Sequence, residues 1–287
     1  MTNQNQQQKG ILYVVATPIG NLADISQRAI DVLQSVNVIA AEDTRRTRQL
    51  LNHFSVDTPC FSLHDYNEKQ RIDSIAKRLD AGESVALVSD AGTPLISDPG
   101  YALVTFLRQQ DYTISPIPGA CALIAALSVS GLATDRFVFE GFLSAKTEAR
   151  KKQLSEISEQ SGTTIIYESS HRIESCLKDM AETLGDERQI VVTRELTKTF
   201  ETVLSGTAGE LIEILQQDDN QKKGEFVVLI QGKAKKADEL KPESIKLAES
   251  LCEHLPAKIA AKIAAETFGD KKNKIYKYLS DKKGAGS

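Results

Sequence analysis

The sequence contains few cysteines and histidines, and neither type is clustered. The four cysteines are widely separated and form no C-x-x-C pair; they are Cys60, Cys121, Cys176 and Cys252. The four histidines are equally scattered. Disulfide frameworks and zinc sites need such residues at short, regular spacings. The sequence therefore argues against both, and no metal site is expected.

Long apolar runs are also missing. No stretch approaches the roughly 18 residues that a membrane-spanning helix needs. The opening residues, MTNQNQQQKG, are polar and do not resemble a signal peptide, so we expect a disordered tail over residues 1–10. Together these features predict a soluble cytoplasmic protein with reduced cysteines and no membrane partner.

Two glycine-rich phosphate-binding motifs are absent as well. The chain has neither a G-K-[ST] sequence nor G-x-G-x-x-G. In both motifs the glycines let backbone N–H groups approach a phosphate closely. Their absence argues against NAD or ATP bound in the usual way, and so against a Rossmann dehydrogenase.

Short apolar runs alternate with helical patterns through most of the chain. Between residues 11 and 118 we expect five strands and four intervening helices, a pattern typical of a parallel, doubly wound sheet. Residues 119–233 continue the alternation and predict a second α/β domain. Residues 234–287 predict a charged linker followed by a small, basic helical domain, while the preceding chain is acidic.

The stretch LVSDAGTPLISDPG, residues 87–100, lies between a predicted strand and a predicted helix. Ligands of parallel sheets bind beyond the carboxyl ends of the strands. Gly92 permits close backbone approach, and the carboxylates of Asp90 and Asp98 can accept hydrogen bonds from ribose hydroxyls or an amine. The loop thus fits a polar, nucleoside-sized ligand, with PIPGACA (116–122) as a second loop of the same pocket. The alternative, that Gly, Pro and Asp merely form turns, stays open.

Several segments together carry a resemblance to a known family. They are LYVVATPIGNLADIS (12–26), AAEDTRRTRQLL (40–51), LVSDAGTPLISDPG (87–100), PIPGACALIAAL (116–127), IYESSHRI (166–173), VVTRELTKTFE (191–201) and GEFVVLIQG (224–232). Each motif alone is modest, but their order along the chain is specific. On these motifs the sequence resembles the ribosomal RNA small subunit methyltransferase I family, which lies within the tetrapyrrole methylase superfamily.

The resemblance implies both a fold and a reaction. Members of this superfamily are S-adenosylmethionine-dependent methyltransferases built from two α/β domains of the tetrapyrrole methylase type, with the cofactor in the interdomain cleft. The family implies 2′-O-methylation of a cytidine ribose in the decoding centre, the P-site region, of 16S ribosomal RNA. The implied partners are 16S rRNA or the small ribosomal subunit, and a second copy of the chain in a homodimer.

The resemblance also implies a set of cofactor contacts. They are expected at Pro18, Asp90, Gly92, Thr93, Ile96, Asp98, Cys121, Ala122 and Tyr167. The superfamily often has Gly-Asp-Pro where this chain has Gly92-Thr93-Pro94. That departure removes a carboxylate from the loop, and Asp90 or Asp98 is the candidate to replace it.

Methyl transfer from a sulfonium is an in-line displacement, so the acceptor oxygen must be aligned with the methyl group. A ribose hydroxyl is a weak acid, and a general base or a nearby cation assists its attack. Glu195 and Lys198, in RELTKTFE, are the catalytic candidates. Lys198 would lower the pKa of the hydroxyl or hold a phosphate, and Glu195 would act as the base or orient Lys198. Ordinary solvated ion pairs are the alternative.

Two basic segments suggest contact with RNA. The first contains Arg45, Arg46 and Arg48, and arginine suits bidentate contacts with phosphate. The second is the lysine-rich end of the chain, with Lys271, Lys272, Lys274, Tyr276, Lys277, Tyr278, Lys282 and Lys283. Lysines near phosphate give salt-dependent affinity, and tyrosines stack on bases. Solvated side chains on a helix start and on a frayed tail are the alternative.

Two other functions stay open. A sibling enzyme that methylates a small, precorrin-like tetrapyrrole would need a roomy, mostly apolar cleft and no basic appendage. A non-catalytic, RNA-binding ribosome assembly factor would keep the basic surfaces without turnover. The basic segments disfavour the first alternative, and the intact order of the loops disfavours the second.

Overall fold

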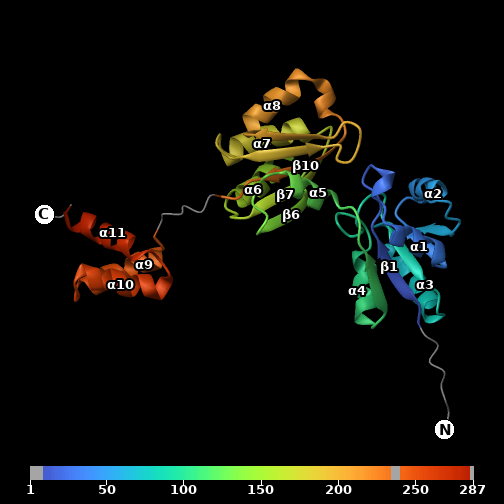
Figure 1. Ribbon diagram of the computed structural model, residues 1–287, viewed down its shortest axis with the longest axis horizontal. Coiled ribbons are helices and arrows are strands. Elements are labelled where there is room, and N and C mark those ends of the chain that lie inside the picture. The colour runs from blue at the N-terminus through green and yellow to red at the C-terminus, as the bar shows by residue number, and fades with distance from the viewer. Residues whose placement is uncertain (1–8, 234–239, 285–287) are drawn as a thin grey trace, which may run out of the picture. The chain divides into compact units, whose positions relative to one another are not determined.

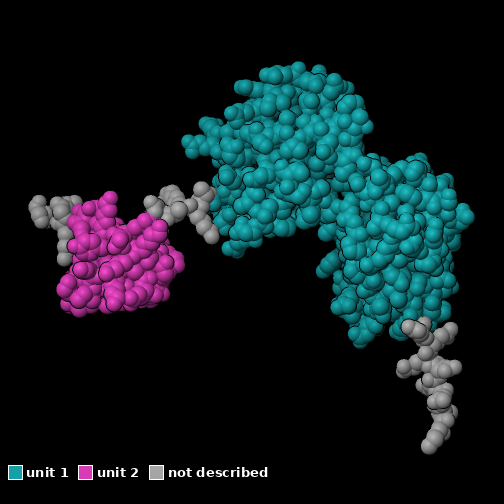
Figure 2. Space-filling model, viewed as in Figure 1, with its two compact units in different colours: residues 1–233 teal, residues 234–287 magenta. Residues whose placement is uncertain are grey.

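The computed structural model describes residues 9–233 and 240–284, which belong to two compact units on either side of the gap (Figure 1, Figure 2). Most of the expected disordered tail and the first part of the expected linker lie outside the described residues. At the described end of the tail, the N–H of Gly10 donates to the carbonyl of Leu79 over 2.7 Å.

The first α/β domain is built on a five-stranded sheet in the order β3-β2-β4-β1-β5, and every neighbouring pair is parallel. Its strands are β1 (Ile11–Val15), β2 (Val38–Ala41), β3 (Cys60–Ser62), β4 (Val85–Val88) and β5 (Thr113–Ile117). Its helices are η1 (Leu22–Asp24), α1 (Gln27–Ser35), α2 (Thr44–His53), α3 (Glu68–Asp80) and α4 (Tyr101–Gln109). The predicted parallel, doubly wound sheet is confirmed.

Helices cover both faces of this sheet. One core joins buried side chains of α1 and α2 to the sheet, and the other joins those of α3 and α4. In Figure 1, α1 and α4 accordingly lie on opposite sides of β1. All residues of β2 and β4 are buried, as expected for central parallel strands, which explains their continuous apolar sequences. The loops that follow the strands therefore gather at one edge of the sheet.

The second domain has a mixed sheet in the order β6-β7-β10-β8-β9. Its strands are β6 (Phe137–Phe142), β7 (Thr163–Ser169), β8 (Ile190–Arg194), β9 (Thr202–Gly206) and β10 (Glu225–Ile230). Its helices are α5 (Ala122–Val129), α6 (Thr147–Ser158), α7 (Ile173–Leu184), α8 (Ala208–Gln217) and η2 (Asp219–Lys222). The final strand, β10, inserts antiparallel between β7 and β8, while β6 and β7 are parallel. Helices α6, α7 and α8 pack on one face, and α5 packs on the other.

The second unit consists of α9 (Pro242–Cys252), α10 (Ala257–Phe268) and α11 (Lys272–Gly284). Its core is formed largely by alanines of α10, together with Ile275 and Leu279 of α11. Gly269 ends α10 with φ +75°, a conformation that glycine adopts without strain. No helix in the described parts of the chain has the length and apolar character needed to cross a bilayer.

Candidate active site

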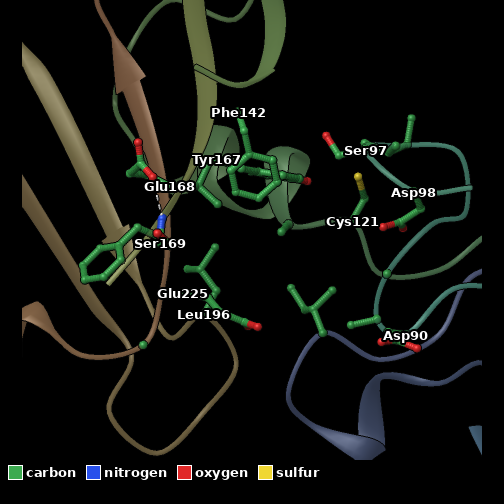
Figure 3. Close-up of a pocket in the computed structure, with 18 of the residues that line it drawn as sticks. Asp90, Ser97, Asp98, Cys121, Phe142, Tyr167, Glu168, Ser169, Leu196 and Glu225 are labelled. Carbon is green, nitrogen blue, oxygen red and sulfur yellow. Dashed lines mark hydrogen bonds between the residues drawn. The ribbon is translucent and has the colours of Figure 1, made fainter. Parts of the chain in front are cut away.

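A cavity of about 520 Å³ lies between the loops at the carboxyl edge of the first sheet and strands β7 and β10 of the second (Figure 3). This volume is within the range of small-molecule sites, about 300–1,000 Å³. Its polar groups include the carboxylates of Glu42, Asp90 and Asp98 and the ammonium of Lys198. The guanidinium of Arg46 also lines it, so the cavity offers anionic acceptors and two cations.

The loop after β4 is fixed by backbone pairing. The N–H of Thr17 donates to the carbonyl of Gly92 over 2.8 Å, and the N–H of Gly92 donates back over 3.0 Å. Gly92 has φ +86°, and a Cβ there would lie 3.3 Å from a methyl carbon of Ile19. The hydroxyl of Thr93 donates to the carbonyl of Ala120 over 3.0 Å. Three loops that follow strands are thus tied together around the cavity.

Backbone strain is concentrated in the two loops that face each other across the cavity. Leu95 and Ser97 have φ of 73° and 64°, while Glu195 and Thr197 have φ of 50° and 67°. A non-glycine residue in this region costs of the order of 1–3 kcal/mol, so such residues persist where the surrounding structure holds them. This strain is typical of ligand-binding loops, and nothing in the residue types revealed it.

Glu42 and Asp90 follow β2 and β4, and the carboxylate of each accepts a backbone hydrogen bond from the other loop. The N–H of Asp90 donates to Glu42 Oε2 over 3.1 Å, and the N–H of Asp43 donates to Asp90 Oδ1 over 3.0 Å. Arg46 Nη1 lies 3.2 Å from the other oxygen of Asp90. Burial raises the pKa of Glu42; the hydrogen bond from the N–H of Asp90 opposes this shift, and the negative charge of Asp90 adds to it. The two carboxylates therefore form a fixed anionic wall.

Asp98 lies on the same side of the cavity as Asp90 and Cys121, opposite Tyr167 and Phe142 (Figure 3). Burial raises the pKa of Asp98 to about 6, and the negative charges of Glu42 and Asp90 contribute to the rise. Asp98 thus changes its charge close to neutral pH.

An aromatic wall faces the carboxylates. The rings of Phe139 and Phe142 make edge contacts with Tyr167, with centroids 4.8 and 5.8 Å away. The hydroxyl oxygen of Tyr167 accepts a hydrogen bond from the N–H of Leu123 over 3.2 Å. Burial raises the pKa of Tyr167, so the phenol remains neutral and positions the start of α5.

Lys198 is held by two carboxylates at the edge of the cavity. Its Nζ donates to Glu195 Oε1 over 2.8 Å and to Glu225 Oε2 over 2.9 Å. Burial opposes the charge of Lys198, but these two acidic partners outweigh it and raise the pKa of the lysine. Burial likewise favours neutral Glu195, but the hydrogen bond from Lys198 and the N–H of Glu225 lower the pKa of Glu195. Lys198 is therefore a firmly protonated cation, and Glu195 is a weak base.

The structure brings most of the predicted cofactor residues together. All of them line the cavity except Pro18, whose neighbour Ile19 lies there instead. Of the two catalytic candidates, Lys198 lines the cavity. Glu195 does not line it, but its carboxylate accepts a hydrogen bond from Lys198.

The three predicted arginines diverge. Arg46 reaches the cavity, but Arg45 pairs with Asp43 at 2.9 Å, and an Nη atom of Arg48 donates to Cys60 Sγ over 3.2 Å. They do not form one phosphate-binding cluster in this structure.

Of the predicted lysines of the second unit, Lys272 and Lys274 lie in the first turn of α11, and Lys271 directly precedes the helix. Further along α11, Tyr276 is 45% exposed. In contrast, the hydroxyl of Tyr278 and the Nζ of Lys282 both donate to Glu249 of α9. The side chain of Lys283 lies outside the described residues.

Sequence reasoning missed several residues of the cavity, including Glu42, Phe142 and Glu225. Glu42 follows directly on a predicted strand, which was a usable signal. Glu225 reaches Lys198 only because β10 inserts beside β8 in the sheet. The position of Phe142 depends on a register shift in β6 between Phe139 and Gly141. Neither of these arrangements is visible in the residue types.

Comparison with known proteins identifies similar chains. Residues 11–212 match the family Tetrapyrrole (Corrin/Porphyrin) Methylases, and residues 238–283 match the RsmI C-terminal HTH domain. The chain is 51% identical over 271 residues to the ribosomal RNA small subunit methyltransferase I of Haemophilus influenzae, covering 94% of this chain and 96% of that protein. It is 54% identical over 269 residues to the Vibrio cholerae protein of the same name, covering 93% of each.

Solved structures share the fold at low sequence identity. Diphthine synthase superposes with a TM-score of 0.58 at 16% identity, covering 77% of this chain and 90% of that one. A cobalt precorrin-4 methyltransferase superposes with a TM-score of 0.56 at 15% identity, covering 77% and 94%. At this level of identity the similarity concerns the fold alone.

Proposed function

Because the chain belongs to the ribosomal RNA small subunit methyltransferase I family, within the tetrapyrrole methylases, we propose that it transfers a methyl group from S-adenosylmethionine to the 2′-oxygen of a cytidine ribose in 16S ribosomal RNA. The proposed target lies in the decoding centre, in the P-site region. The observation that carries the proposal is the carboxylate-lined cavity at the carboxyl edge of a parallel sheet, faced by Lys198.

The chemistry of the cavity suits S-adenosylmethionine. This molecule carries a sulfonium, an ammonium and ribose hydroxyls, all of which favour oxygen acceptors, and when bound it supplies an electrophilic methyl group. Asp90 and Asp98 offer carboxylates, and Gly92 leaves the backbone open to close approach. The start of α5, with Cys121 and Ala122, and the aromatic side chain of Tyr167 complete the proposed site.

Lys198 is the proposed contact to the acceptor nucleotide. As a protonated ammonium it stabilises negative charge that develops on the ribose oxygen, or holds an adjacent phosphate. Glu195 and Glu225 keep it in position through the two hydrogen bonds described above. The lowered pKa of Glu195 supports an orienting role for this carboxylate rather than that of general base.

The RNA is proposed to contact both units. Arg46 lies at the cavity, where its guanidinium can reach a phosphate. In the second unit, the short turn at Gly269 between α10 and α11 is typical of helix-turn-helix domains. Lysines at the start of α11 would add salt-dependent affinity for RNA. The homodimer implied by the family stays a prediction, which light scattering on the purified chain tests.

The test uses methyl-labelled S-adenosylmethionine and small ribosomal subunits from cells that lack the endogenous modification. We expect label on one cytidine 2′-oxygen in the decoding centre, mapped by nuclease digestion and mass spectrometry. Free 16S ribosomal RNA offered in parallel shows whether the assembled subunit is needed. A precorrin-like tetrapyrrole serves as the competing acceptor.

The outcomes separate the candidate functions. Label on the tetrapyrrole alone would replace the proposal with small-molecule methylation. Tight binding to the subunit without cofactor binding, measured by calorimetry, would favour a non-catalytic assembly factor. Label on another nucleotide would keep the reaction class and change the target.

A further inference from the structure

Strand β6, at the edge of the second sheet, contains a β-bulge. Phe139 pairs with Ile165 of β7, but the next residue of β7, Ile166, pairs with Gly141 rather than with the intervening residue. Gly141 has φ +65°, the conformation that glycine supplies in bulges of this kind. One extra residue is therefore inserted before Phe142.

The bulge decides which face of the sheet Phe142 occupies. Side chains alternate between faces along a strand, so a regular β6 would turn Phe142 away from the face that carries Phe139. With the inserted residue, Phe142 pairs with Tyr167 instead and lies on the same face, beside its ring. That face is the one that borders the cavity (Figure 3).

Phe142 borders the cavity but is not packed into the core. It is 54% exposed, whereas its neighbour Leu143 is 2% exposed. The bulge also lies close to the strained loop of the first domain, because a Cβ at Gly141 would be 3.3 Å from Ser97 Oγ. The backbone irregularity thus presents an open aromatic ring at the rim of the site, where it contributes little to folding.

We propose that Phe142 is a stacking platform for the nucleobase of the acceptor nucleotide. The inference rests on the proposed function, in which a ribose hydroxyl enters the cavity. The base is attached to the carbon next to the one that bears this hydroxyl, so it must lie within a few bonds of the reacting oxygen. Proteins commonly hold an unpaired RNA base by stacking it on an aromatic side chain. An exposed ring at the rim of the cavity can stack against a base that is no longer stacked on its neighbours in the RNA.

The test compares Phe142→Ala, Phe142→Leu and Phe142→Trp with the wild-type chain on unmodified small subunits. Stacking on an aromatic residue is worth about 1–3 kcal/mol per base, so Phe142→Ala should lower kcat/KM by about 5-fold to about 150-fold. Phe142→Leu should remain impaired, because it restores apolar bulk but no ring, while Phe142→Trp should recover activity. Phe137→Ala, on the same strand but outside the cavity lining, is the matched control and should behave as wild type.

Calorimetry with S-adenosylmethionine alone distinguishes the base of the RNA from the adenine of the cofactor. We expect every Phe142 variant to bind the cofactor with wild-type affinity. A matching loss of cofactor affinity, or full activity of Phe142→Ala or Phe142→Leu, would overturn the stacking role and leave the proposed function intact. A wild-type chain that binds the cofactor but labels no RNA would instead overturn the proposed function, and the stacking role with it.

Discussion

The affinity for S-adenosylmethionine should depend on the charge of Asp98. Burial, reinforced by Glu42 and Asp90, raises the pKa of Asp98 to about 6. Below that value the carboxyl group becomes neutral and no longer attracts a cationic ligand. Cofactor affinity should therefore fall as the pH drops through the pKa of Asp98, and it should no longer depend on pH well above that value, where Asp98 is fully ionised.

The size of the effect follows from proton linkage. If only ionised Asp98 binds the cofactor, the apparent Kd rises about tenfold for each pH unit below the pKa. At the pKa, half of the free protein carries the proton, so binding releases about half a proton. Glu42, whose pKa is also raised, should steepen the loss at lower pH.

The assay is isothermal titration calorimetry with the cofactor below, at and above the pKa of Asp98, in two buffers with different ionisation enthalpies. Wild-type protein should show a buffer-dependent heat near the pKa. Asp98→Asn should bind more weakly at high pH and lose this proton release, whereas Asp73→Asn, an exposed residue of α3, should match wild type. A wild-type affinity that does not change through the pKa, or an Asp98→Asn variant that keeps the wild-type pH dependence, would refute the reasoning.

Three further variants test separate parts of the structure. Lys198→Met should lower kcat on small subunits and spare cofactor affinity, while Lys178→Met, an exposed partner of Glu174, should change neither. Gly92→Ala should destabilise the protein by about 1–2 kcal/mol in urea unfolding, because its φ is +86°, whereas Gly209→Ala in α8 should stabilise it. Removal of residues 234–287 should weaken subunit binding in filter assays and leave cofactor binding in place; unchanged subunit affinity would exclude the helical unit as an RNA contact.

The fold of the first domain could be predicted because its signals are local. Buried parallel strands such as β4 appear in the sequence as continuous apolar runs. In the amphipathic helices between them, apolar residues instead recur every three to four positions. The order of the second sheet has no such signal. Strand β10 is last in the domain yet lies between β7 and β8, and only this long-range insertion brings Glu225 to Lys198.

Those residues of the candidate site that are polar and lie just after a strand could be predicted from the sequence. Asp90 and Asp98 were found in this way. Phe142 was missed because its side of the sheet is set by one inserted residue, which alternation alone does not predict. At the charged end of the chain, the sequence does not show which partners the side chains have. Lys282 and Tyr278 look like RNA contacts in sequence, but both bind Glu249 within the helical unit.

The alanine-rich core of the helical unit has a consequence for how the protein melts. Among the described residues, that core draws on side chains between 240 and 279, and it shares no residue with the cores of the two α/β domains. Because the two units have separate cores, heating should produce at least two calorimetric transitions rather than one. A single melting temperature measured for the whole chain would then describe neither unit, and stabilising substitutions need to be judged on the transition to which they belong.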